Sequence, residues 1–262
     1  MNKLQTLAGE LLDNKEVSLI IGYQKGANNK TRAAFISTSE DSKNLIFDDT
    51  CKQNLAVYLS KKEINKFGKI AIVCQQTTLK SIIVLTSEYQ LSENIFAIIL
   101  DKENNWQCLK TVEEISNFSE SNSQTNSTSL ELIEKMTLEE RWNYWQDQFS
   151  KCFKCYACRA ACPLCYCDRC TVENNQPQWI SIPSSKVGNL EWHIMRAMHL
   201  AGRCINCNAC AEACPQGIPL NILTQKLTND IFNDFKYTPG KSSTQTNVLS
   251  TFDVKDKENF IK

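Results

Sequence analysis

The sequence lacks the features of an exported or membrane-inserted protein. Its first residues contain no apolar stretch followed by small residues, so we expect no signal peptide. Its apolar runs, such as residues 95–100, are far shorter than the ~20 residues that a membrane helix needs. The 29 basic and 29 acidic residues cancel, so no long-range attraction to nucleic acid or to an anionic membrane is expected. These absences predict a cytoplasmic protein with no nucleic-acid partner and no membrane insertion.

The chain also lacks the glycine-rich motifs that bind nucleotides. Neither a GxGxxG fingerprint nor a P-loop occurs in its 262 residues, and histidine occurs only twice, at His193 and His199. Cysteine, in contrast, occurs fourteen times. Disulfide-dense domains are usually small and exported, and this chain has no export signal. We therefore interpret the cysteines as metal ligands and not as a disulfide scaffold.

The order of apolar patterns predicts the fold class α+β, with a small N-terminal α/β domain followed by a mostly helical, cysteine-rich domain. A strand at 70–74, a helix at 77–89 and a strand at 95–100 predict a right-handed crossover and a parallel strand pair. Further expected elements are strands at 17–23 and 33–36 and helices at 2–13, 51–62, 189–202 and 219–236.

A polar segment separates the two predicted domains. Residues 117–129 contain ten Ser, Thr or Asn in thirteen positions, a composition typical of a flexible linker. The polar C-terminal tail has few apolar residues, and we expect it to lie as an extended strap over a partner or over this chain. The predicted divisions are an α/β domain at 1–116, a linker at 117–136, a cysteine-rich domain at 137–238 and a tail at 239–262.

Eight cysteines form one motif twice. Each copy reads C-x2-C-x2-C-x3-C-P, the ligand run of two-cluster bacterial ferredoxins, in which the fourth cysteine binds the other cluster. The cysteine-rich domain is therefore predicted to be ferredoxin-like. One 4Fe–4S cluster is expected on Cys152, Cys155, Cys158 and Cys214. The other is expected on Cys204, Cys207, Cys210 and Cys162.

Zinc is the competing interpretation of these two motifs. Zinc sites use four ligands in CxxC pairs, which does not explain a third cysteine at x2, a fourth at x3 and a following proline in both copies. The spacing favours iron–sulfur clusters. Crossed ligation would hold the motifs together across the 41 residues between Cys162 and Cys204.

Three further cysteines follow the first motif, at Cys165, Cys167 and Cys170. Three thiolates cannot close a four-ligand site, so a fourth ligand must come from elsewhere. Cys51 opens a predicted helix, where backbone N–H groups favour a thiolate, whereas Cys74 ends a buried strand and reads as a core residue. We expect a third 4Fe–4S cluster on Cys165, Cys167, Cys170 and Cys51. Zinc at these residues and free or redox-active thiols are the alternatives.

An aromatic helix leads into the first motif. Thr137 forms a capping box with the acid three residues later, and an apolar stripe of Leu138, Trp142, Trp145 and Phe149 follows. We expect the tryptophans to pack over the clusters and exclude water, with electron relay as the alternative. The two histidines are expected to pack or to donate to a cluster sulfur, with ligation as the alternative.

The segment from Cys152 to Cys170, CFKCYACRAACPLCYCDRC, resembles a segment in iron–sulfur beta subunits of formate dehydrogenases and deazaflavin-reducing hydrogenases. Similar proteins accompany heterodisulfide reductase complexes. Residues 199–210 and 217–220 are similar to the same group. The resemblance covers residues 137–262 well and is weaker over parts of the N-terminal domain.

One departure from these families concerns the turn after the strand at 70–73. Relatives with a flavin-related domain often carry a Lys-Gly-Cys-Asp-like turn there. This chain has Gln75-Gln76-Thr77-Thr78, without the cysteine and the acid. The resemblance therefore implies an electron-relay subunit better than a catalytic one.

The implied function is that of an electron-transfer iron–sulfur subunit of an anaerobic oxidoreductase complex. Two 4Fe–4S clusters, or three with the extra cysteines, would relay electrons between a catalytic subunit and another carrier. The expected partners are redox proteins such as hydrogenase, formate dehydrogenase or heterodisulfide reductase-type subunits. We expect no catalytic residue and no flavin. A flavin- or deazaflavin-binding oxidoreductase subunit and an oxygen-sensitive redox sensor are the alternatives.

Overall fold

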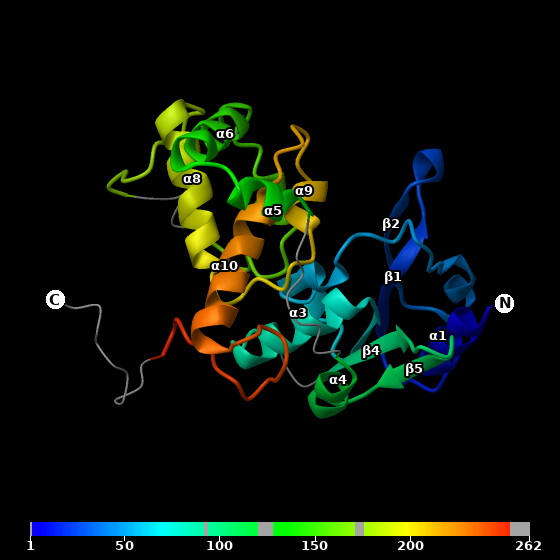
Figure 1. Ribbon diagram of the computed structural model, residues 1–262. Coiled ribbons are helices and arrows are strands. Elements are labelled where there is room, and N and C mark those ends of the chain that lie inside the picture. Colours follow the sequence, from blue (N-terminus) through cyan, green and yellow to red (C-terminus); the bar gives the residue numbers. More distant parts are fainter. Residues whose placement is uncertain (1, 92–93, 120–127, 171–175, 252–262) are drawn as a thin grey trace.

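The computed structural model describes residues 2–91, 94–119, 128–170 and 176–251. A five-stranded sheet with its covering helices forms one side of the molecule, and a helical region that carries both cysteine motifs forms the other (Figure 1). This arrangement confirms the predicted α+β class. In the described part of the chain, no helix combines the length and the apolarity needed to cross a membrane.

The centre of the sheet is parallel. Its order is β2-β1-β3-β4-β5, and β1 (Leu19–Lys25), β3 (Ile70–Cys74) and β4 (Ile95–Leu100) run in the same direction, with Ile72 opposite Ala97. These strands are buried on both faces, which is why they read as continuous apolar runs. The predicted parallel pair is confirmed.

Two antiparallel strands close the edges of the sheet. The strand expected at 33–36 is present as β2 (Thr31–Ile36), which pairs with β1. The other edge strand, β5 (Trp106–Leu109), pairs with β4 and was not expected from the sequence. Its four residues are too few to show a clear alternation of apolar and polar side chains.

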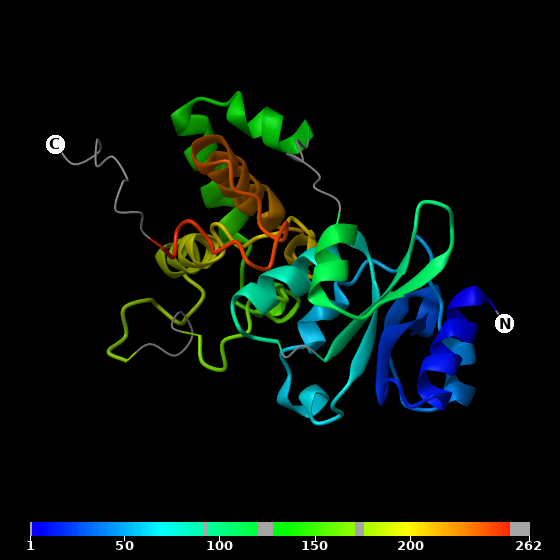
Figure 2. The ribbon, with the colours of Figure 1, turned by 90° about the horizontal axis from the view of Figure 1, so that it is seen from below.

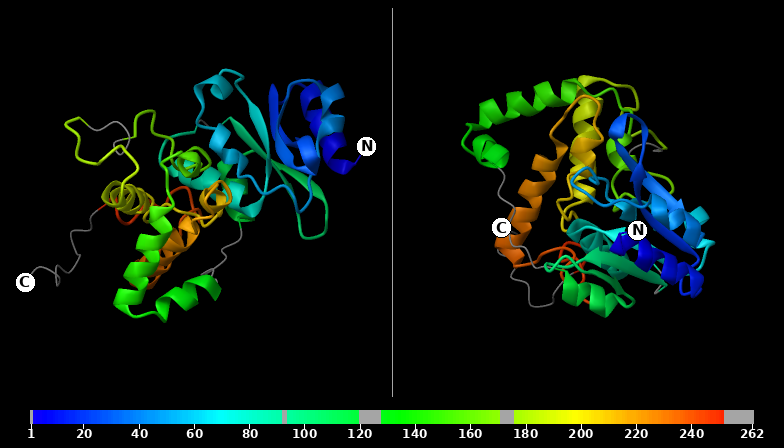
Figure 3. Two further views of the ribbon diagram at one scale, coloured as in Figure 1. Left: turned by 90° about the horizontal axis from the view of Figure 1, so that it is seen from above. Right: turned by 90° about the vertical axis from the view of Figure 1, so that its right-hand side faces the viewer.

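Helices cover both faces of the sheet (Figure 3). α1 (Lys3–Asp13) begins at an Asn2 capping box and packs beside the 3-10 helix η2 (Ser39–Asn44). α3 (Gln76–Ser87), which links β3 to β4, packs with α4 (Val112–Phe118) on the other face. Both helices predicted here, at 2–13 and 77–89, are present.

The helix predicted at 51–62 is wrong. The chain forms a short 3-10 helix, η3 (Leu55–Tyr58), and a single turn, α2 (Lys62–Asn65). Asn54 explains the difference, because its side chain accepts from Ala56 N and donates to Ser81 Oγ of α3. A cap at this position starts a new turn and interrupts a continuous helix.

Four helices build most of the second half of the molecule. They are α5 (Thr128–Glu134), α6 (Leu138–Ser150), α8 (Lys186–His199) and α10 (Leu220–Phe235), with α5 lying against α10 (Figure 2). α5 falls inside the predicted linker, because Leu130 and Ile133 find an apolar partner in Ile222. The rest of that segment, residues 120–127, lies outside the described residues.

The two halves share one apolar core. Leu164, Leu200 and Ile205, all near the cysteine motifs, pack with the buried residues of the sheet domain. The tail adds a further contact, since Ser119 Oγ donates to the carbonyl oxygen of Gly240 and Asn247 donates to Ala201. The described part of the tail therefore lies over this chain, and residues 252–262 lie outside the described residues.

Candidate metal centres

The two cysteine motifs adopt the same unusual backbone. Lys154 and Tyr156 have φ of 56° and 59°, and their counterparts Asn206 and Asn208 have 56° and 61°. A non-glycine residue in this left-handed region costs about 1–2 kcal/mol, so four of them at matched positions indicate a loop held by what it surrounds. The N–H of Lys154 points at the sulfur of Cys152, 3.4 Å away. Such donors favour thiolates that carry negative charge.

The four cysteines predicted for the first cluster line one cavity. Three come from the first motif and the fourth, Cys214, comes from the second, as crossed ligation requires. Four soft sulfur donors around one space suit iron–sulfur chemistry. Burial raises the pKa of Cys158 to about 11, and the nearby guanidinium of Arg196 partly offsets this effect. The residues that line this cavity include Cys152, Cys155, Cys158 and Cys214.

The cysteines predicted for the second cluster lie next to the sheet domain. Cys162, Cys204 and Cys207 pack against the shared core, and Cys204 interacts with both Cys207 and Cys210. The short helices that follow the two motifs, α7 (Ala157–Ala160) and α9 (Ala209–Glu212), contact each other. The second set is thus adjacent to the first, and burial raises the pKa of Cys204 to about 12.

Neither set of cysteines is drawn together around a single ion. Throughout the described ranges, no three His, Cys, Asp or Glu side chains lie close enough to hold one metal ion. Cys214, from the second motif, lines the first motif's cavity, and this crossed contribution is typical of a two-cluster ferredoxin and is not required by a tetrahedral zinc site.

A buried arginine lies between the two sets. Arg196 of α8 is 6% exposed, and its Nη2 donates to the carbonyl oxygen of Cys158 at 3.0 Å. Burial lowers the pKa of Arg196, but the negative charge of nearby cysteines has the larger combined effect and raises it. These cysteines are Cys165, Cys162, Cys158 and Cys210. One fixed positive charge therefore acts on cysteines of both predicted clusters.

Aromatic side chains cover the first cavity. Trp192, 2% exposed, lines it and meets Tyr156 edge-on at 4.9 Å. His193 also lines it and stacks on Phe149 at 4.5 Å. Burial lowers the pKa of His193 to about 3, so the ring is neutral, and neither ring nitrogen has a hydrogen-bond partner among the described residues. A neutral imidazole here has an N–H free to donate to a sulfur.

The prediction that the apolar side chains of α6 pack over the clusters is only partly correct. Phe149 is buried and Trp145 packs beside it, whereas Leu138 is 81% exposed and Trp142 is 49% exposed. The first half of α6 extends beyond the cavity. The apolar side chains on this half of the helix are therefore exposed to solvent. These two side chains do not shield a cluster within this chain.

The extra cysteines lie apart from Cys51. Cys165, Cys167 and Cys170 line one cavity at the end of α8, together with His199. Cys51 is fully buried in the sheet-domain core and is not among the residues that line this cavity. The N–H of Asp48 does donate to its sulfur, as expected, but burial is the larger effect and raises the pKa of the Cys51 thiol.

Comparison with known proteins identifies the class of the cysteine-rich region. Residues 147–218 match the family described as "4Fe-4S dicluster domain". This region is therefore a dicluster domain, and the chain carries two 4Fe–4S clusters. The assignment of particular cysteines to each cluster stays a prediction, which the geometry above supports.

Two curated proteins show what the chain is similar to. The "F420-dependent formate dehydrogenase subunit beta" of Methanocaldococcus jannaschii is 34% identical over 112 residues, which cover 41% of this chain and 29% of that protein. The "F420-dependent formate dehydrogenase 1 subunit beta" of Methanococcus maripaludis is 34% identical over 109 residues, covering 42% and 27%. The chain thus spans less than a third of these relatives, and the expected resemblance to beta subunits of formate dehydrogenases is confirmed.

Proposed function

We propose that this chain is an electron-transfer iron–sulfur subunit of an oxidoreductase complex. The observation that carries the proposal is the cavity to which the two motifs together contribute four cysteines, Cys152, Cys155, Cys158 and Cys214. Two 4Fe–4S clusters supply one-electron chemistry, accepting and releasing single electrons with little rearrangement of their ligands.

The residues around the cysteines would tune the reduction potentials of the clusters and shield them from water. Trp192 and Phe149 exclude water, and Arg196 supplies a positive charge that favours the reduced state. His193 provides a neutral donor at the first cavity. These are the roles of a relay protein, which holds and tunes a redox group and needs no substrate pocket.

The partners of this subunit are proposed from its relatives. Both relatives are named as beta subunits of F420-dependent formate dehydrogenases. We infer that this chain docks on a catalytic subunit of related anaerobic chemistry, of the formate dehydrogenase, hydrogenase or heterodisulfide reductase type, in the cytoplasm. Trp142 and Leu138, exposed on α6, offer apolar surface for such a contact.

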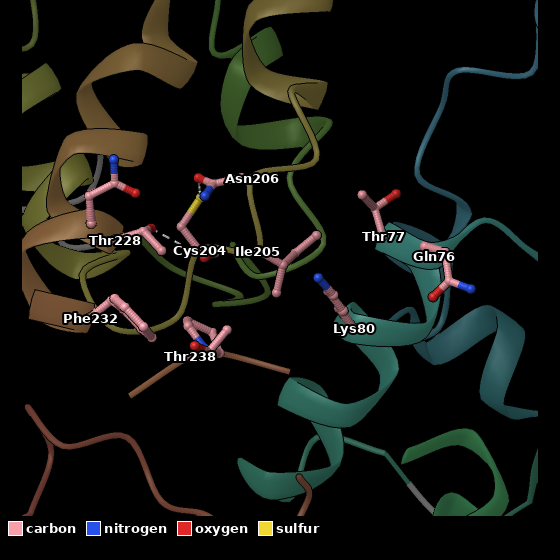
Figure 4. Close-up of a pocket in the computed structure, with 11 residues that line it drawn as sticks. Gln76, Thr77, Lys80, Cys204, Ile205, Asn206, Thr228, Phe232 and Thr238 are labelled. Atoms are coloured by element: carbon pink, nitrogen blue, oxygen red, sulfur yellow. Dashed lines mark hydrogen bonds between the residues drawn. The ribbon is translucent and has the colours of Figure 1, made fainter. Parts of the chain in front are cut away.

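A cavity between the two halves bears on the flavin-binding alternative. It lies beside Cys204, between α3 and the second motif, with Lys80 directed toward it (Figure 4). Its volume is about 140 Å³, whereas pockets for drug-sized ligands and cofactors usually measure ~300–1,000 Å³. A flavin would therefore not fit next to the second motif, whereas a cavity of about 360 Å³, lined by residues from 57–63 and 159–168, lies within that size range. Acid extraction that releases flavin from the purified protein would argue for the alternative.

Substitution of one crossed ligand tests the proposal. Cys214→Ser removes a sulfur that the second motif gives to the first cluster, so we expect about four irons per chain to be lost while the second cluster's signal remains. Cys108→Ser, in edge strand β5 and away from both cavities, is the control and should keep all iron. The measurements are iron content and electron paramagnetic resonance of the reduced, anaerobically purified protein.

The partner proposal needs a separate experiment. The native protein, purified without oxygen, should elute together with a catalytic oxidoreductase subunit and should pass electrons from it to a dye. A chain that elutes alone as a monomer and carries both clusters would contradict the subunit function without affecting the cluster assignment.

A further inference from the structure

We propose that the chain holds a third 4Fe–4S cluster on Cys165, Cys167 and Cys170, with His199 as its fourth ligand. The inference goes beyond the two clusters of the dicluster domain. It replaces Cys51, the fourth ligand that the sequence suggested, by a histidine from the end of α8.

The first argument is the composition of the cavity. The three extra cysteines and His199 line the same space, which is about 50 Å³ and larger than the cavity of about 20 Å³ at the first predicted cluster. His199 is exposed and lies in the last turn of α8, so its ring can turn toward the cavity without disturbing the core. Imidazole is an accepted iron ligand, and it replaces cysteine in one type of iron–sulfur centre.

The second argument is where the structure puts the competing ligand. Cys51 is 0% exposed within the sheet-domain core, and its sulfur accepts from the N–H of Asp48 at 3.4 Å. Moving this sulfur to the cavity would require the core around it to open. The loop that bears the extra cysteines still reaches the sheet domain, through the exposed ion pair between Lys62 and Asp168 at 2.9 Å. That contact brings the loop next to the sheet domain without a bond to Cys51.

The third argument concerns charge. Three arginines, Arg159, Arg196 and Arg203, line the cavity beside the cysteines. Anionic thiolates around a cluster are stabilised by such cations. A neutral histidine in place of a fourth thiolate makes the site one unit less negative, which reduces the repulsion among the ligands.

The nature of the metal follows from the spacing of the donors. Cys167 is exposed and the other two cysteines are half-buried, and within the described ranges no such trio is gathered tightly enough for one ion. A closed Cys3His zinc site would need all four donors within bonding distance of a single centre. The four cysteines of the first motif's cavity, where a cluster is predicted, are likewise not gathered around one ion in the described ranges. Cys165 also lines a cavity together with Cys162, a predicted ligand of the second cluster, so the new centre would lie next to that cluster and extend the electron path.

The experiment is iron, sulfide and zinc analysis of the full chain after anaerobic purification and reconstitution with iron and sulfide. We expect about twelve irons per chain and three electron paramagnetic resonance components after full reduction. His199→Ala should lower the iron to about eight, leaving the two dicluster components intact. His199→Cys should restore about twelve irons and shift the third component to lower potential, since a thiolate replaces a neutral ligand.

Cys51→Ala is the matched control and should retain the full iron content. Loss of the third component in Cys51→Ala, with none in His199→Ala, would restore Cys51 as the ligand and overturn the assignment of His199. About eight irons in the unsubstituted protein would overturn the third cluster, and one zinc per chain in addition would identify a zinc site instead. None of these results would change the assignment of the two clusters in the dicluster domain. Cys214→Ser tests that assignment separately.

Discussion

Arg196 should raise the reduction potential of both dicluster centres. Its guanidinium is buried and lies 3.0 Å from the carbonyl oxygen of Cys158, which places its charge beside the first cluster and within reach of the second. Reduction adds one negative charge to a cluster, and a nearby positive charge stabilises that state. Arg196→Met removes the charge and keeps an apolar side chain that fills much of the same space.

The expected size of the effect follows from Coulomb's law. A unit charge about 8 Å from the centre of a cluster, at an effective dielectric constant of about 20, contributes about 2 kcal/mol. Since about 1.4 kcal/mol corresponds to about 59 mV for one electron, Arg196→Met should lower each potential by about 90 mV. Potentiometric titration of the reduced clusters, followed by electron paramagnetic resonance, measures both values.

Two further variants separate charge from packing. Arg196→Lys keeps the positive charge and should stay within about 30 mV of the unsubstituted protein, a third of the Coulomb estimate. Arg141→Met removes an arginine from the distant half of α6, eleven residues before Cys152, and should leave both potentials unchanged. Equal potentials in Arg196→Met and the unsubstituted protein, or an equally large shift in Arg196→Lys, would refute the electrostatic explanation.

Two other predictions concern how the halves are held together and how the first cluster is protected. Glu88→Gln weakens the bidentate ion pair with Arg203, at 2.5 and 2.7 Å and less than a fifth exposed. The thermal midpoint, measured anaerobically by circular dichroism, should therefore fall by about 2–4 °C for each kcal/mol of stability lost. Asp168→Asn, in a fully exposed pair, should leave the midpoint unchanged, and an equal fall in both variants would contradict the argument. Trp192→Ala opens the first cavity, and the loss of visible absorption in air should become several-fold faster, at a stability cost of about 3–5 kcal/mol. Trp179→Ala, at a residue 79% exposed, should bleach at the original rate, and a matching acceleration there would rule out shielding by Trp192.

Much of the fold could be predicted from local patterns in the sequence. The strands at 70–74 and 95–100 are buried on both faces, and such strands show themselves as unbroken apolar runs. The capping box at Thr137 marked the start of α6, because a cap is a contact between residues three apart. The helix predicted at 51–62 failed, since the side chain of Asn54 bonds to α3, and a partner so distant in sequence leaves no local signal.

Part of the candidate site could likewise be predicted from the sequence, and part could not. Trp192 and Asn189 were not singled out from the sequence, although Trp192 lines the first cavity and Asn189 donates to the carbonyl oxygen of Cys152 at 2.7 Å. The spacing of Trp192, Arg196 and His199 on α8, four and three residues apart, was the available signal that one helix face meets the cysteines. That spacing alone does not say which elements the face meets.

The sequence by itself determined the chemistry of this protein, because the spacing of cysteines along the chain decides which sulfurs can surround one cluster. The tertiary structure decided which side chains complete and surround the sites. It placed Cys51 in the sheet core and His199 beside the extra cysteines, set Arg196 between the two motifs and joined both halves in one core. These outcomes depend on packing between segments far apart in the chain, and no local pattern of residues records that packing.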